Sequence, residues 1–174
     1  MKDKIFPVIL IFLAVLLRFL PHPVNVAPIT AMALFGGVYF NKKYALLVPL
    51  VVMFFSDLFL GFHNTMLFVY GSFLLAGVIG VILKRHNNFK WILGGTLLSS
   101  VLFFIITNFG VWFMNMGNMY AKNLAGLAQC YVMAIPFFRN TVLGDLFYTV
   151  IMFGGYQILC RFYKQFGAKN SIEE

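Results

Sequence analysis

The sequence predicts an all-α integral membrane protein, a compact bundle of six transmembrane helices in a single domain that covers residues 1–174. Three observations predict this class. Of the 174 residues, 61% are hydrophobic and only 10% are charged, whereas soluble domains average roughly 25% charged residues. The mean hydropathy is +0.89. Apolar runs also recur along the whole chain between short polar gaps, which leaves room for a helical bundle but not for an additional soluble domain.

Six apolar runs account for the six predicted helices. In chain order they are Ile5–Leu20, Ile29–Phe40, Tyr44–Leu60, Thr65–Leu83, Trp91–Met114 and Thr141–Phe162. The last three are long enough to cross a bilayer, for which about 20 residues are needed. The second run is short and contains Gly36 and Gly37, so that run alone is also compatible with a re-entrant segment. We expect it to span, because the distribution of basic residues is then consistent.

The basic residues predict the orientation, since Lys and Arg are enriched in cytoplasmic loops. With the N-terminus in the cytoplasm, ten of the 13 Lys and Arg residues lie inside, and only Arg18, Lys122 and Arg139 lie toward the outside. A re-entrant second run would move the basic residues between the fourth and fifth runs to the outside. Both termini are therefore predicted to be cytoplasmic. The net charge of +8 reflects this orientation, and we predict no nucleic-acid partner.

The longest connection between the runs is predicted to lie outside, over residues 117–136. Tyr120, Leu124, Leu127 and Tyr131 are spaced like one face of a helix. The spacing is compatible with a short helix around residues 118–135, which either lies across the outer mouth of the bundle or only packs at the membrane surface.

A strip of small residues runs along the fourth run, where Ser72, Ala76 and Gly80 recur every four residues. Such a strip lets another helix approach closely. Packing within this chain is the favoured interpretation, and a docking face for a partner protein is the alternative.

Polar side chains concentrate in the outer half of the predicted spans and in the outer turns. Charged groups inside a membrane are costly and indicate functional sites. The candidate substrate-binding residues are Arg18, His22, Asn25, Asp57, His63, Asn108, Arg139, Asn140 and Asp145. The inner half of every run is almost purely apolar, whereas a conducting pathway needs polar groups throughout. The pattern therefore favours a cup that captures a small solute from outside.

The charged candidates suggest roles, and each also has a simpler explanation. We expect Arg18 and Arg139 to bind an anionic group of the solute, and Asp57 and Asp145 to orient these arginines or accept hydrogen bonds. Alternatively, Arg18 extends to the outer headgroups, Asp57 caps a turn or pairs with Arg18, and Asp145 caps the sixth helix. Further hydrogen bonds to the solute are expected from His22, Asn25, His63 and Asn108.

No metal or cofactor is predicted. His22, Asp57 and His63 carry imidazole and carboxylate groups that suit nickel, cobalt or zinc, but they lack the close, fixed spacing of a metal motif. Cys130 and Cys160 fall on opposite sides of the membrane in the predicted topology, so we expect no disulfide between them. The chain has no C-x-x-C pair and no G-x-x-x-x-G-K-[ST] run for ATP.

Five stretches carry a resemblance that covers nearly the whole chain. They are Arg18–Asn25 (RFLPHPVN), Ala31–Gly37 (AMALFGG), Ser56–His63 (SDLFLGFH), Thr107–Trp112 (TNFGVW) and Ala134–Asp145 (AIPFFRNTVLGD). These stretches resemble a small family of bacterial multi-pass membrane proteins whose function is not established. The resemblance implies a location in the bacterial cytoplasmic (inner) membrane.

More distantly, the chain is similar to the S components of energy-coupling factor (ECF) vitamin transporters. That resemblance implies six helices, cytoplasmic termini and a ligand site near the outer surface that is closed by loops. It also implies a transmembrane T component and cytoplasmic ATPases as partners. S components often have an Ala-x-x-x-Ala docking motif on the first helix, whereas the first run here has only Ala14.

The predicted function is therefore a membrane-embedded substrate-binding subunit for uptake of a small solute, surrounded by the lipid bilayer. One alternative is a structural or assembly protein, in which the polar cluster only locks the helices together. Another is an intramembrane enzyme that uses Asp57 and Asp145. Gly144-Asp145 supplies half of a Gly-x-Gly-Asp motif, but Val142 stands at the first glycine position. Since H-E-x-x-H and G-x-S-x-G are absent too, we predict no enzyme.

Overall fold

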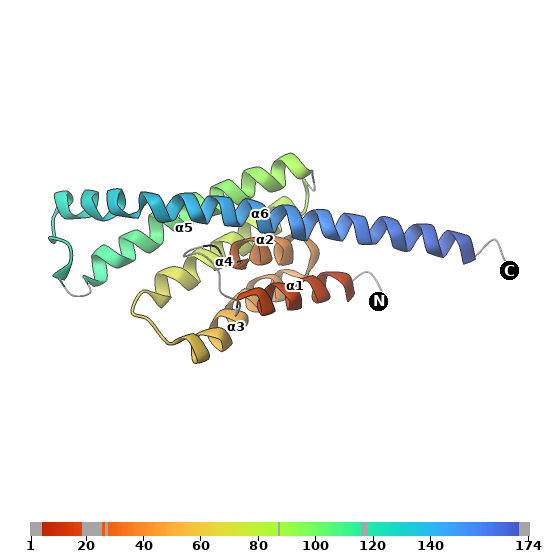
Figure 1. The fold of residues 1–174 in the computed structure, drawn as a ribbon, viewed down its shortest axis with the longest axis horizontal. Coiled ribbons are helices and arrows are strands. Elements are labelled where there is room, and N and C mark those ends of the chain that lie inside the picture. Colours follow the sequence, from red (N-terminus) through yellow and green to blue (C-terminus); the bar gives the residue numbers. More distant parts are fainter. Residues whose placement is uncertain (1–4, 19–25, 27, 87, 116–117, 171–174) are drawn as a thin grey trace.

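The computed structural model describes residues 5–18, 26, 28–86, 88–115 and 118–170. In chain order the helices are α1 (Ile5–Arg18), α2 (Ile29–Tyr39), α3 (Lys42–Leu60), α4 (Met66–Leu83), α5 (Phe89–Met114) and α6 (Leu124–Asn170). Figure 1 shows one bundle in which α1 begins and α6 ends on the same side. The predicted all-α class is confirmed, and each of the six apolar runs forms a helix.

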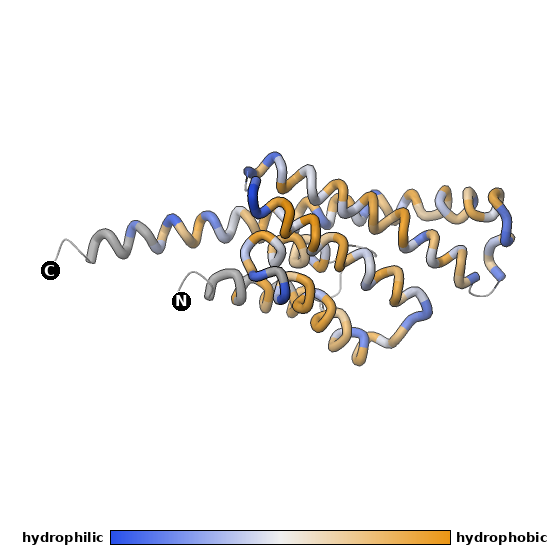
Figure 2. Tube along the Cα trace, turned by 180° about the vertical axis from the view of Figure 1, so that it is seen from behind, coloured by the Kyte–Doolittle hydropathy of each residue, from blue (hydrophilic) through white to orange (hydrophobic). Residues whose placement is uncertain are grey.

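Four of the described helices, α3, α4, α5 and α6, are long and apolar enough to cross a membrane. Figure 2 shows hydrophobic residues along most of their length, as expected of a multi-pass membrane protein. The other two are shorter. At 1.5 Å per residue, the 14 residues of α1 extend about 21 Å and the 11 residues of α2 about 16 Å. The 11 residues of α2 do not reach across a hydrocarbon core of about 30 Å, and neither do the described residues 5–18 of α1.

The short helix α2 is the centre of the bundle. Every residue from Ile29 to Val38 is buried, which is the behaviour of a helix that is hydrophobic on all sides. The helix packs against α1, α3, α4, α5 and α6, and most extensively against α4. On the side of α6, Phe35 meets Phe153 edge to face with ring centroids 5.1 Å apart. Protein therefore surrounds α2 where lipid would surround an ordinary span.

The contact between α2 and α4 depends on glycine. A Cβ atom added to Gly37 would lie 2.6 Å from backbone atoms of Gly77 and Gly80, and one added to Gly80 would lie 2.4 Å from the carbonyl oxygen of Leu34. The two helices therefore cross backbone against backbone, which small residues permit in membrane proteins. The predicted packing role of the small-residue strip within the chain is confirmed at Gly80.

The sixth helix is longer than predicted. Residues from Leu124 onward are helical, but they belong to the 47-residue helix α6, which continues through Pro136. The prediction of a separate short helix around residues 118–135, with a new span from Thr141, is therefore wrong. Proline is tolerated inside membrane helices because neighbouring groups satisfy the freed backbone carbonyl. The helix is about 70 Å long, and its C-terminal part extends beyond the bundle in Figure 1.

The two cysteines lie far apart on α6, in its first and last thirds. Both are free thiols, as predicted. Cys130 is buried and Cys160 is partly exposed.

Candidate functional site

Buried polar side chains form a seam between α5 and α6. Helix α6 contributes Thr141, Asp145 and Thr149, which are four residues apart and so share one face. Helix α5 contributes Thr96 and Ser100. All five side chains are at most 5% exposed. The Ser100 Oγ atom lies 2.7 Å from Asp145 Oδ2, and the hydroxyl oxygens of Thr96 and Thr149 are 3.1 Å apart. We call these five residues the polar seam; its two cross-links join α5 to α6.

The first turn of α2 meets the polar seam. The Thr30 side chain in this turn lies close enough to the Asp145 carboxyl group to interact with it. The first N–H groups of a helix have no partner within that helix, and the N-cap residue Pro28 supplies no side-chain hydrogen bond. The partial positive charge of a helix N-terminus also attracts the oxygen atoms of a carboxyl group placed there. Asp145 therefore joins three helices, α2, α5 and α6.

The chain that leads into α2 also packs directly on α6. A Cβ atom added to Gly144 would lie 3.1 Å from the Cα and Cγ1 atoms of Val26. The glycine beside Asp145 therefore lets Val26 approach the backbone of α6. This approach helps to bring Thr30 within reach of the Asp145 carboxyl group.

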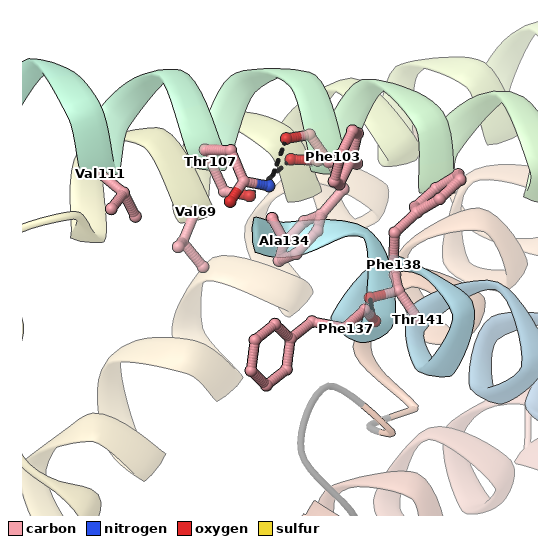
Figure 3. Close-up of a pocket in the computed structure, with 10 residues that line it drawn as sticks. Val69, Phe103, Thr107, Val111, Ala134, Phe137, Phe138 and Thr141 are labelled. Carbon is pink, nitrogen blue, oxygen red and sulfur yellow. Dashed lines mark hydrogen bonds between the residues drawn. The ribbon is translucent and has the colours of Figure 1, made fainter. Parts of the chain in front are cut away.

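A cavity of about 210 Å³ lies beside the polar seam, between α4, α5 and α6 (Figure 3). Its lining comprises Val69, Phe103, Phe104, Thr107, Asn108, Val111, Ala134, Phe137, Phe138 and Thr141. Drug-sized ligands occupy pockets of about 300–1,000 Å³, so this cavity suits a smaller solute. Thr141 belongs to both the cavity and the polar seam, one helical turn before Asp145.

Three polar side chains interrupt the aromatic and aliphatic lining. Thr107, Asn108 and Thr141 each donate a hydrogen bond to the carbonyl oxygen four residues earlier in the same helix, at 2.7, 2.8 and 3.0 Å. A threonine hydroxyl that donates still has lone pairs, and the asparagine amide has a carbonyl oxygen besides its donor nitrogen. The cavity therefore offers hydrogen-bond acceptors within a mostly apolar wall, which suits a solute that carries N–H or O–H groups.

Two of the predicted site residues lie at the cavity or at the polar seam beside it. Asn108 lines the cavity, and Asp145 lies in the adjoining polar seam. Asp57 is also buried, but it lies at the contact between α3 and α4, where the Tyr70 hydroxyl donates to its Oδ2 atom at 2.6 Å. The buried carboxyl groups of Asp57 and Asp145 are thus held by different partners.

The other predicted site residues are not placed in the cavity. Arg139 is exposed and Asn140 is half-buried, although both belong to the part of α6 that borders the cavity. His63 is exposed in the turn after α3. Outside the described atoms lie His22, Asn25 and the side chain of Arg18, whose backbone ends α1. Their roles in binding stay predictions.

Sequence reasoning missed the hydroxyl groups of the polar seam. The spacings Thr96-x-x-x-Ser100 and Thr141-x-x-x-Asp145-x-x-x-Thr149 were visible, since residues four apart share a helix face. Thr96 lies in the inner half of the predicted run Trp91–Met114. The expectation that this half is almost purely apolar therefore overlooked a buried polar contact.

Two neighbouring serines of α5 provide a test of the cross-link. Ser100→Ala is expected to lower the free energy of unfolding by about 1–2 kcal/mol, because the Asp145 carboxyl group loses its partner on α5. Ser99 is equally buried, but its hydroxyl has no hydrogen-bond partner among the described atoms. Ser99→Ala is therefore expected to change stability by less than about 0.5 kcal/mol. Detergent unfolding followed by circular dichroism compares the two variants, and equal losses would contradict the assigned cross-link.

Comparison with models of protein families assigns the chain to one family. The family model described as "Family of unknown function (DUF6580)" matches residues 1–167, so the chain belongs to this family. No curated protein and no solved structure matches the chain.

Proposed function

We propose that this DUF6580 protein is a membrane-embedded substrate-binding subunit that captures a small solute for uptake. The cavity between α4, α5 and α6 is the observation that carries the proposal. Ligand pockets are typically apolar and aromatic with a few polar groups that orient the ligand. The phenylalanine-rich wall, with Thr107, Asn108 and Thr141, matches that description.

The charge distribution supports an outward-facing cavity. If the chain termini lie in the cytoplasm of a bacterium, as the basic residues favour, the connection between α5 and α6 lies outside. The cavity is lined by the end of α5 and the early part of α6, so it is then nearer the exterior. We therefore propose capture from the outer face of the bacterial cytoplasmic membrane.

The solute that fits is small and partly aromatic or apolar, with hydrogen-bond donors for the three polar side chains. Exposed Arg139, three residues after Pro136 on the helix that borders the cavity, would attract an anionic group on the solute as it enters. The chain has no G-x-x-x-x-G-K-[ST] motif for ATP, and in this proposal separate subunits supply the energy for transport. The similarity to S components favours a T component with its ATPases in this role.

Filling the cavity tests the proposal. Ala134 is 8% exposed and lines the cavity, so Ala134→Phe should occupy the space of the solute. We expect its affinity to fall at least about 100-fold, equivalent to about 2.7 kcal/mol. Ala128→Phe makes the same change at an exposed position of α6, and it should bind within about twofold of the original protein.

The solute for this experiment comes from native mass spectrometry of the purified protein, which detects retained small molecules. A panel of vitamin-like aromatic heterocycles serves if none is retained. Asn108→Leu provides a second cavity variant in case Ala134→Phe unfolds. Equal affinities for Ala134→Phe and Ala128→Phe, or no binding of any solute in the panel, would refute the proposed function.

A further inference from the structure

The contacts of Ser100 bear on the protonation of Asp145. The Ser100 Oγ atom lies 2.7 Å from Asp145 Oδ2 and 3.0 Å from the carbonyl oxygen of Thr96. A serine hydroxyl carries one hydrogen, whereas an ionised carboxylate and a carbonyl oxygen only accept. If the carboxyl group of Asp145 carries a proton, it donates to Ser100 Oγ and Ser100 donates to Thr96. Both short contacts are then hydrogen bonds, whereas an ionised Asp145 allows only one of them.

The surroundings of Asp145 favour the same state. The side chain is 3% exposed and lies within a membrane-crossing helix, where an isolated charge tends to be neutralised. Its partners among the described residues are the hydroxyl groups of Ser100 and Thr30. The first turn of α2 contributes a partial positive charge, but this is less than a full cation.

Other charged and titratable groups on the helices around Asp145 do not form hydrogen bonds or ion pairs with it in the described part of the chain. Arg139 and Lys90 are exposed on α6 and α5. Tyr39 of α2 and Tyr148 of α6 pack against the hydrophobic core. The α1 side chains that the structure describes are all apolar.

We propose that Asp145 is a proton-binding site inside the membrane, and that solute capture in the neighbouring cavity is linked to this proton. The second half of the proposal rests on the proposed function, whereas the proton site does not. On release, the O–H bond of the carboxyl group breaks and the proton passes to water, with no transfer of electrons. The hydrogen of Ser100 then turns from the Thr96 carbonyl to the new carboxylate.

The linkage follows from the position of the cross-link. The Ser100–Asp145 contact joins α5 to α6. The cavity wall is formed by the turns of α5 that follow Ser100 and by the turns of α6 that precede Asp145. An ionised Asp145 is a charge that needs water, so α5 and α6 separate to hydrate it. The proton-bound state therefore holds α5 and α6 together beside the cavity, and the proton-free state lets this wall of the cavity separate.

Infrared difference spectroscopy tests the proton site without any solute. Purified protein in lipid vesicles is titrated from about pH 5 to about pH 9. We expect a C=O stretching band of a protonated carboxylic acid that weakens as the pH rises and is lost in Asp145→Asn. Asp145→Glu serves as a second variant and should shift the band. A spectrum that keeps the whole band in Asp145→Asn, or that shows none at the lowest pH, would overturn the proton site.

Cys130 reports the separation of the two helices. Its thiol is 2% exposed and donates to the carbonyl oxygen of Asn108 on α5 at 3.4 Å. In a Cys160→Ser background, N-ethylmaleimide labels only Cys130, since the chain has two cysteines. The labelling rate with Asp145 is divided by the rate with Asp145→Asn at each pH, which removes the pH dependence of the thiol itself.

We expect this ratio to be near one at low pH and to rise about fivefold as the carboxylic-acid band disappears. A ratio that stays constant across the titration would overturn the linkage, even if the infrared band confirms the proton site. Both measurements use the protein alone. A protein that captures no solute can therefore still show the proton site, and a protein that binds solute can still fail both tests.

Discussion

Gly37→Ala is expected to prevent stable assembly of the bundle, with a loss of more than about 3 kcal/mol in the free energy of unfolding. The new methyl group would lie 2.6 Å from the backbone of Gly77 and Gly80. Overpacking a core ordinarily costs about 1–3 kcal/mol, and here the obstacle is backbone that has no alternative rotamer. Because other helices enclose α2, it has no lipid-facing side toward which it can move.

The adjacent glycine is the matched control. A Cβ atom on Gly36 would meet its nearest neighbour, the Phe40 side chain, at 3.7 Å, which is an ordinary contact. Gly36→Ala should therefore be neutral, or stabilise α2 by up to about 1 kcal/mol through helix propensity. Size-exclusion chromatography after heating compares the fraction of folded protein in the two variants. Similar behaviour of both variants would refute the backbone contact between α2 and α4.

Asp145→Ala is expected to lower the free energy of unfolding by about 2–3 kcal/mol. Interhelical hydrogen bonds in membranes average about 0.6 kcal/mol each and reach about 1.7 kcal/mol, and Asp145 has partners on α2 and on α5. Removal of the carboxyl group also leaves a small cavity among packed helices, which adds to the loss. Detergent unfolding monitored by circular dichroism measures the change.

Asp145→Asn separates the structural contribution of this residue from its charge. The amide keeps the size of the carboxyl group and can donate to Ser100 and accept from Thr30, so we expect a change of less than about 1 kcal/mol. If the polar seam is only a structural lock, Asp145→Asn will leave solute affinity unchanged at every pH. If Asp145→Asn costs as much as Asp145→Ala, the hydrogen-bond assignment in the polar seam is wrong.

Much of the fold could be predicted because a bilayer leaves few options. Backbone groups must be satisfied within each segment in lipid, so long apolar runs become helices. The enclosure of α2 could not be predicted in the same way. Its length and its glycines mark it as the weakest span, but its burial depends on five other helices that pack around it. The continuity of α6 through Pro136 was missed because local signals for a turn were overridden by packing.

Two residues of the candidate site stand out in the sequence, but the arrangement of the site does not. Asn108 and Asp145 stand out because they are polar groups in apolar runs. Their partners are less conspicuous, since serine and threonine are common in membrane helices and often bond only to their own helix. Ser100 is 45 residues from Asp145 in the chain, and only the packing of α5 on α6 shows that the two side chains meet.

The enclosure of α2 has a consequence for biogenesis. Most membrane helices are stable in lipid before they associate, but an 11-residue helix is too short to be an independent insertion unit. Its packing partners α4, α5 and α6 are synthesised after it. The central helix α2 is therefore synthesised before most of the helices that enclose it. Until they are made, we expect α2 to stay at the membrane surface or in the insertion machinery. We therefore expect final entry of α2 into the bilayer to be a late step, which follows synthesis of the C-terminal half.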